Sequence, residues 1–176
     1  MTLPPTRQDQ APRVDTAWGE RPPLTSAMFN PALIACLLRE AALVCSTHAA
    51  ADMPWALSYL AIPLVLHRGT REALPARPGA VQLAAWVVRK NPVLRAGFPA
   101  QAQAMVDPVR AGLRFALRHE VLELAEDRLR APARRIREPG HAPVGLDEIL
   151  KRARTAGGWL STVDTVTAFS LLGVAP

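Results

Sequence analysis

The chain has 176 residues and a formal net charge of +6, from 21 Lys and Arg residues against 15 Asp and Glu residues. Hydrophobic residues make up 49% of it, which excludes a wholly disordered chain and is enough for a buried core. The most apolar run, residues 55–66, is shorter than the roughly 20 residues of a membrane span. The polar, proline-rich N-terminus does not resemble a signal peptide, and two cysteines do not make a disulfide framework. We therefore expect a cytoplasmic protein without a membrane partner.

Arginine dominates the basic residues, since only Lys90 and Lys151 are lysines. A basic, arginine-rich composition can indicate a phosphate-binding protein, because the guanidinium group pairs well with phosphate. With abundant alanine, it is also what the codon bias of a GC-rich genome produces. The position of the arginines, and not their number, therefore has to decide between these two explanations.

Residues 1–27 predict a flexible arm, because five prolines disfavour helix and strand and the charges cancel. Asn30 and Pro31 then predict a helix start, since Asn suits the N-cap and Pro the first helical position. This helix is expected to run to about His48. It is apolar nearly all round, which is typical of a helix buried in a core or between subunits.

A second helix is predicted to open at Asp52 or Pro54, with a kink or break at Pro63. Gly69 is expected to end it, and Thr70 to cap a short turn over residues 71–74.

From Ala80 onward the pattern predicts three helices, over residues 81–90, 92–105 (broken near Gly97) and 107–119. Two short strands within residues 121–131 follow, with a turn between them. Helix, helix, helix and hairpin is the order of a winged helix. After a proline- and glycine-rich loop, we expect a helix over 147–160, weakened by Gly157-Gly158. A last short helix is expected to begin at a cap formed by Asp164 or Thr165, to run to Leu172 and to end at Gly173. The predicted fold is therefore mainly α: one compact helical domain over residues 28–176, with a winged-helix-like segment at about 80–131 that carries one short β-hairpin.

The residues that could bind a metal or act in catalysis do not form a motif. Cys36 and Cys45 fall on opposite sides of one predicted helix, and Cys45 with His48 supplies only two of the three or four ligands that zinc uses. The four histidines have no motif neighbours, and neither a nucleophile motif nor a phosphate-binding glycine loop is present. We expect no metal, no cofactor and no enzymatic activity.

A basic patch is the strongest sign of a binding surface. Arg110, Arg114 and Arg118 follow one another at every fourth position of a predicted helix, in a stripe beside its apolar face. In a DNA-binding winged helix this third helix enters the major groove. The predicted patch also takes in arginines of the hairpin and the following loop: Arg128, Arg130, Arg134, Arg135 and Arg137. Residues 110–137 hold eight arginines against four acids. This excess of positive charge is compatible with binding of nucleic acid, with binding of a protein partner, or with a solvated surface that binds nothing.

Several segments resemble the middle-component proteins of bacterial three-component ABC systems, a group that includes the small subunit of Lamassu-type antiphage defence. The most specific one reads Pro63-Leu-Val-Leu-His-x-x-Thr-Arg71. The others are Asn30-Pro-Ala-Leu-Ile-Ala-Cys-Leu-Leu-Arg-Glu-Ala, Leu83-Ala-Ala-Trp with Asn91-Pro-Val-Leu-Arg-Ala-Gly-Phe, and Ala168-Phe-Ser-Leu-Leu-Gly-Val. The resemblance covers Asn30 to the C-terminus and leaves only the arm outside.

This resemblance implies a non-enzymatic accessory subunit. Its partners would be an SMC/Rad50-like ABC ATPase that senses nucleic acid and an effector, often a nuclease. The subunit would link the two and restrain the effector. It would reach double-stranded DNA through the complex. No catalytic residues carry over. The Pro63–Arg71 motif predicts a partner-binding corner, formed by Pro63, Leu64, His67, Arg68, Thr70 and Arg71. The alternative is that these residues only shape the turn. The alternative function is a stand-alone winged-helix DNA-binding regulator.

Overall fold

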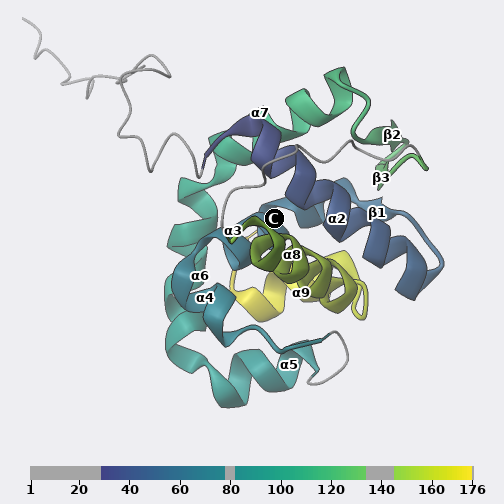
Figure 1. The fold of residues 1–176 in the computed structure, drawn as a ribbon. Helices are drawn as coiled ribbons and strands as arrows, with labels where there is room; N and C mark the ends of the chain where they lie inside the picture. Colours follow the sequence, from purple (N-terminus) through teal and green to yellow (C-terminus); the bar gives the residue numbers. More distant parts are fainter. Residues whose placement is uncertain (1–28, 78–81, 134–144, 176) are drawn as a thin grey trace, which may run out of the picture.

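The computed structural model describes residues 29–77, 82–133 and 145–175, and every structural statement below refers to these ranges (Figure 1). The expected arm and most of the loop over residues 132–145 lie outside them. The described chain is mainly helical and has one small antiparallel sheet, which confirms the predicted fold class. The sheet lies at one side of the molecule, and helices make up the rest of it (Figure 1).

The central helix, α2 (Pro31–Ala49), begins as the sequence predicts. The Asn30 side-chain oxygen accepts a hydrogen bond from the Ala32 N–H at 2.9 Å, and Pro31 occupies the first turn. Helices α7 (Val106–Arg118) and α8 (Leu146–Leu160) pack along α2 and bury side chains such as Leu37 and Leu38 completely. Burial on several sides is what the apolar pattern of α2 predicts.

Among the described residues, α2 is also the one helix that is long and apolar enough to cross a membrane by length and composition. The expectation that the chain has no membrane span rested on the shorter run at residues 55–66, whereas α2 also passes this test. A core helix passes the same test, and eight residues of α2 are buried in this fold. Its length and composition are therefore explained by its position in the core.

Two glycines let the flanking helices approach α2 closely. A Cβ added to Gly157 of α8 would lie 2.6 Å from the Cα of Ala41, and one added to Gly112 of α7 would lie 2.7 Å from the Cβ of Ile34. Both distances are too short for real atoms. Gly157 and Gly158 were expected to weaken their helix, yet α8 runs through them to Leu160 because packing against α2 replaces the missing helix propensity.

The sheet contains a strand that the sequence analysis missed. Strands β2 (Glu123–Ala125) and β3 (Arg128–Arg130) form the expected hairpin, and β1 (Met53–Pro54) adds to β3, in the order β1-β3-β2. Residues 52–54 were expected to open a helix, and that prediction is wrong. Met53 pairs instead with Leu129, and both side chains are buried. Such pairing depends on a distant segment and leaves no local signal.

The segment after β1 also differs from the prediction. One 3₁₀ turn, η2 (Trp55–Leu57), leads into α3 (Ser58–Leu66) and α4 (Arg68–Ala73). Pro63 lies inside α3 without ending it, because only one intrahelical donor is lost there. The break comes at His67, which has extended backbone angles, and Gly69 lies inside α4 instead of ending a helix.

The remaining elements complete the helical layer. Helix α5 (Leu83–Ala85) passes into a π turn, η3 (Trp86–Lys90), and then into α6 (Pro92–Ala104), which continues through Gly97. Helix α9 (Thr165–Leu172) begins at the Asp164 cap and ends at Gly173, as expected. The structure differs from the winged-helix-like segment expected at about 80–131. Helix α7 and the hairpin are present, but α2 and α3, from before this segment, also pack on α7, and β1 extends the hairpin.

Candidate functional site

Helix α7 presents one apolar face to the core and one basic face to solvent. Val109 and Ala116 are fully buried against the rest of the fold, and Gly112 brings the backbone of α7 onto α2. Because side chains three and four residues apart share a helix face, the arginines of the predicted stripe point the other way. All three are exposed: Arg110, Arg114 and Arg118.

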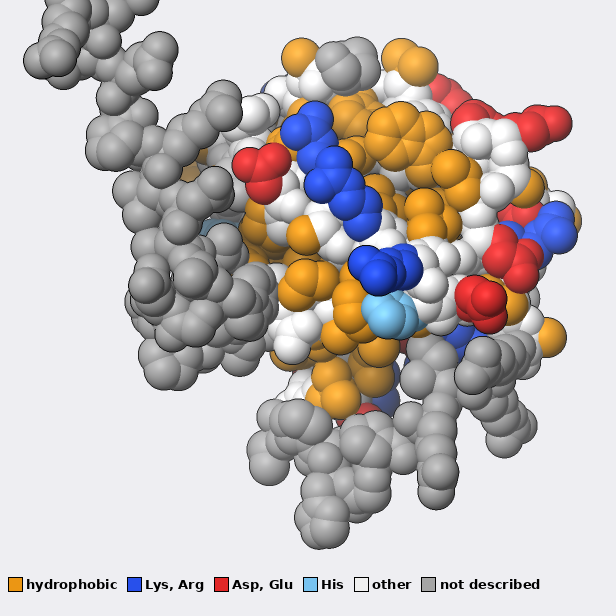
Figure 2. Space-filling model, turned by 90° about the horizontal axis from the view of Figure 1, so that it is seen from above, with side chains coloured by type: hydrophobic (Ala, Val, Ile, Leu, Met, Phe, Trp, Pro, Cys, Tyr) orange, Lys and Arg blue, Asp and Glu red, His pale blue; other side chains and the backbone are white. Residues whose placement is uncertain are grey.

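Most of the charge in this stripe is not neutralised by the described residues. Arg110 lies 3.5 Å from the Asp107 carboxylate, but both side chains are more than half exposed, so the pair contributes little to stability. Arg114 and Arg118 form no ion pair or hydrogen bond with any residue that the structure describes. Figure 2 shows a row of Lys and Arg side chains across this face, with most of the visible Asp and Glu side chains gathered to its right.

The end of α7 directs the chain into the hairpin. Glu120 adopts the left-handed conformation with φ 55°, and the Val121 N–H donates to the Ala116 carbonyl at 2.8 Å, which closes the helix. Strand β2 consequently packs against α7, so the hairpin lies next to the helix that carries the arginine stripe (Figure 1). Three carboxylates of the hairpin are exposed: Glu123, Glu126 and Asp127.

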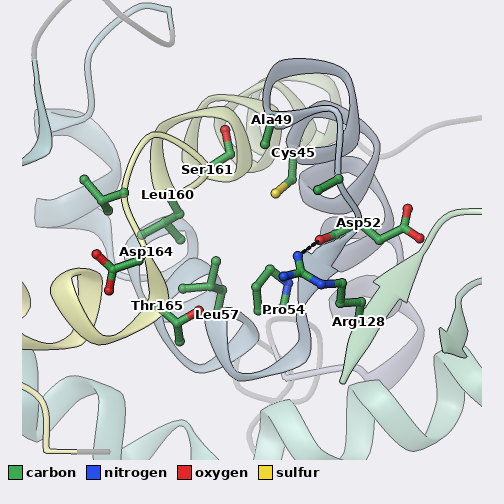
Figure 3. Close-up of a pocket in the computed structure, with 12 residues that line it drawn as sticks. Cys45, Ala49, Asp52, Pro54, Leu57, Arg128, Leu160, Ser161, Asp164 and Thr165 are labelled. Carbon is green, nitrogen blue, oxygen red and sulfur yellow. Dashed lines mark hydrogen bonds between the residues drawn. The ribbon is translucent and has the colours of Figure 1, made fainter. Parts of the chain in front are cut away.

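The hairpin arginines differ from those of α7, because they are bound to the loop before β1. Arg128 donates to the Asp52 carbonyl at 2.8 Å, as Figure 3 shows, and Arg130 donates to the Asp52 carboxylate at 2.9 Å. The structure therefore divides the predicted patch into a stripe on α7, of which Arg114 and Arg118 have no described partner, and a paired group on β3. The three remaining members lie outside the described residues: Arg134, Arg135 and Arg137.

The Pro63–Arg71 motif forms the junction between α3 and α4. The Thr70 hydroxyl lies 2.9 Å from the carbonyl oxygens of both Leu64 and His67, and 3.2 Å from that of Pro63. The Arg71 guanidinium donates to the carbonyls of Val65 and Leu66 at 3.1 and 3.0 Å. Since the last carbonyls of a helix have no intrahelical partner, these side chains satisfy the end of α3. Thr70 was expected to cap the turn that follows it, and instead it binds the helix that precedes it.

Burial divides the six motif residues predicted to bind a partner. Pro63, Leu64 and Thr70 are buried and Arg71 is half-buried, so these four shape the junction. The two exposed ones are His67 and Arg68, and Arg68 donates to Glu72 at 2.7 Å. That hydrogen bond lowers the pKa of the Glu72 carboxyl and raises the pKa of Arg68. The partner-binding role of the six residues stays a prediction, with His67 and Arg68 as the exposed part of the motif.

A shallow pocket of about 200 Å³ lies between the end of α2, the β1 region and the turn from α8 to α9 (Figure 3). Burial raises the pKa of the Cys45 thiol to about 11, so the thiol is neutral at physiological pH. The Asp164 carboxylate accepts hydrogen bonds from the Thr167 N–H and hydroxyl, which lower its pKa. Arg128 donates to the Asp52 carbonyl and the Asp52 carboxylate accepts from Arg130, so the charged groups of this pocket have structural partners. In the described ranges, no three His, Cys, Asp or Glu side chains are grouped to hold a metal ion.

Comparison with families of known proteins identifies the chain. No curated protein and no solved structure matched it. Residues 18–176 match the family described as ABC-three component (ABC-3C) system Middle Component 3. The match begins before Asn30 and so includes residues 18–27 of the arm, which the resemblance had left outside. With most of its length matched, the chain belongs to the Middle Component 3 family of ABC-three component systems.

Proposed function

We propose that this protein is a non-catalytic accessory subunit that links an SMC/Rad50-like ABC ATPase to an effector, of nuclease type, in a cytoplasmic defence complex of the Lamassu kind. The match of residues 18–176 to a middle-component family carries this proposal, because a middle component acts with other components of its system. The surface of α7 adds support. Two of its arginines have no described partner, and they stand on a helix whose other face is fixed in the core.

Co-expression tests this function directly. The chain is produced with the products of its neighbouring genes, and the complex is analysed by size-exclusion chromatography with light scattering. We expect one species of fixed stoichiometry that contains the ATPase, the effector and this chain. Omitting one component at a time shows which of the two this subunit contacts. A chain that always elutes alone, at micromolar concentrations of all three, would exclude the linking role.

DNA binding is the second candidate, and the chain order favours it. Helix α2, strand β1, helix α3, helix α7 and the β2–β3 hairpin follow one another as in a winged helix, with α4 to α6 inserted before α7. In that arrangement α7 is the helix that reads the major groove, and it carries the arginine stripe. A stand-alone winged-helix regulator would bind DNA through α7 in this way.

Titration of the isolated chain with duplex DNA tests the alternative. Three phosphate contacts, one for each arginine of the stripe, would make log Kd change with log salt concentration with a slope of about 3. Tight binding with this slope, in the absence of any complex, would favour the regulator. An affinity that stays weak and does not depend on Arg114 would exclude α7 as a DNA-reading helix.

A further inference from the structure

The surface formed by α7 and the hairpin is polarised, not basic. Residues 106–130 contain five arginines and five acids, so their formal net charge is zero. Of the excess of four positive charges expected over residues 110–137, three belong to arginines after residue 133, outside the described chain, and Asp107 offsets the fourth. What the described residues present is a positive row on α7 next to a negative hairpin.

The pairing of the hairpin arginines strengthens this polarity. Arg130 donates to the Asp52 carboxylate and Arg128 to the Asp52 carbonyl, so both exposed arginines are turned towards the loop before β1, whereas Glu123, Glu126 and Asp127 are exposed on the hairpin next to α7. Of these carboxylates, Asp127 has only a distant partner, the Arg128 guanidinium at 3.9 Å. The hairpin therefore presents carboxylates to whatever binds along α7.

Uniformly charged DNA does not fit this pattern. A duplex carries about one negative charge per 1.7 Å of its axis. If it bound along α7, its phosphates would also approach the carboxylates of the hairpin, because β2 packs against α7. Like charges in close contact are costly, whereas a protein surface can present both signs in register.

Exposed apolar side chains also favour a protein. Leu117, beside Arg118 on α7, is 37% exposed, and Leu124, on β2, is 51% exposed. Protein interfaces combine such apolar contacts with arginine, whereas phosphates gain nothing from leucine.

We propose that the α7–hairpin surface, defined by Arg110, Arg114, Arg118, Leu117, Glu123 and Leu124, binds an acidic helix of another subunit of the ABC complex. Arg110 and Arg118 lie eight residues apart, so the stripe extends over about 12 Å, the length of two helical turns. Carboxylates four residues apart on a partner helix match this spacing. A basic residue of the partner then faces the hairpin. This inference rests on the proposed function.

The test measures assembly of the full-length chain with its ATPase and effector. The double charge reversal Arg114→Glu/Arg118→Glu is compared with Arg89→Glu/Lys90→Glu. This control makes the same change in charge at exposed residues of η3, next to α5 and far from α7 (Figure 1). We expect the α7 variant to weaken assembly at least tenfold and the control to change it less than twofold, with equal melting temperatures for both.

A second variant separates the two macromolecules. Glu123→Lys/Asp127→Lys makes the hairpin basic, so a DNA-binding surface gains affinity for duplex DNA, whereas the proposed surface loses affinity for its protein partner by about fivefold or more. Normal assembly by the α7 variant, or stronger assembly and DNA binding by the hairpin variant, would overturn the inference. Failure of the wild-type chain to assemble would instead contradict the proposed function itself.

Discussion

Gly157 lies directly against the backbone of Ala41, at the point where α8 packs on the central helix α2. A Cβ added there would be 2.6 Å from the Ala41 Cα and would overlap its carbonyl oxygen. Because the obstacle is backbone and not the end of a flexible side chain, the two helices cannot relax locally. This contact sets how closely α8 packs on α2.

Gly157→Ala is therefore expected to destabilise the fold by at least about 3 kcal/mol, the upper part of the usual cost of overpacking. Urea unfolding followed by circular dichroism measures the change. Gly97→Ala is the matched control, because Gly97 is exposed within α6 and its nearest neighbour is the Gln101 amide at 3.6 Å. That variant should gain about 0.5–1 kcal/mol from helix propensity. Equal stabilities for the two variants would contradict the close packing of α8 on α2.

Thr70→Val should cost about 1–2 kcal/mol, because it removes a buried hydroxyl that serves the carbonyls at the end of α3 and keeps nearly the same shape. Thr47→Val removes a hydroxyl that also donates to a backbone carbonyl, that of Leu43, but at an exposed position. Its cost should stay below about 0.5 kcal/mol. Chemical denaturation of both variants makes the comparison, and a neutral Thr70 variant would show that water satisfies the end of α3.

Trp86→Phe should cost about 2 kcal/mol. The Trp86 indole N–H donates to the Ala73 carbonyl at 2.8 Å, and its ring meets Trp159 edge to face with centroids 4.9 Å apart. Trp55→Phe offers a control, since Trp55 is 44% exposed and has a looser ring contact with Tyr59, at 5.8 Å. Circular dichroism should follow unfolding, because both variants alter tryptophan fluorescence. A larger loss of stability in Trp55→Phe than in Trp86→Phe would contradict the core position assigned to Trp86.

The fold should lose stability in alkaline solution through Cys45. Burial raises the pKa of this thiol from 9.0 to about 11, so above pH 9 the unfolded chain releases the proton first. The contribution is complete below pH 9 and is lost as the pH rises towards 11. Unfolding midpoints at pH 8 and pH 10 should therefore differ more in the wild type than in Cys45→Ala. Identical pH dependence of the two proteins would contradict a buried neutral thiol.

Local signals in the sequence were sufficient for much of the helical framework. The Asn30 cap, the Asp164 cap and the Gly173 terminator lie where the sequence predicts them, because capping involves residues only a few positions apart. The spacing of Arg110, Arg114 and Arg118 likewise predicted one exposed face of α7. Their periodicity is a property of a single helix and needs no knowledge of its neighbours.

Contacts between distant segments were beyond these signals. Asp52 binds Arg128 and Arg130 across more than 70 residues of sequence, and Met53 joins the sheet only because Leu129 is there to pair with it. The glycine at 157 reads as a weak point in a helix until α2 is known to lie against it. The sequence by itself thus determined most of the helices, several of their caps and the basic stripe of α7, because these depend on neighbours along the chain. Only the tertiary structure decided which arginines stay unpaired and that the hairpin beside them is acidic, because charge pairing depends on neighbours in space.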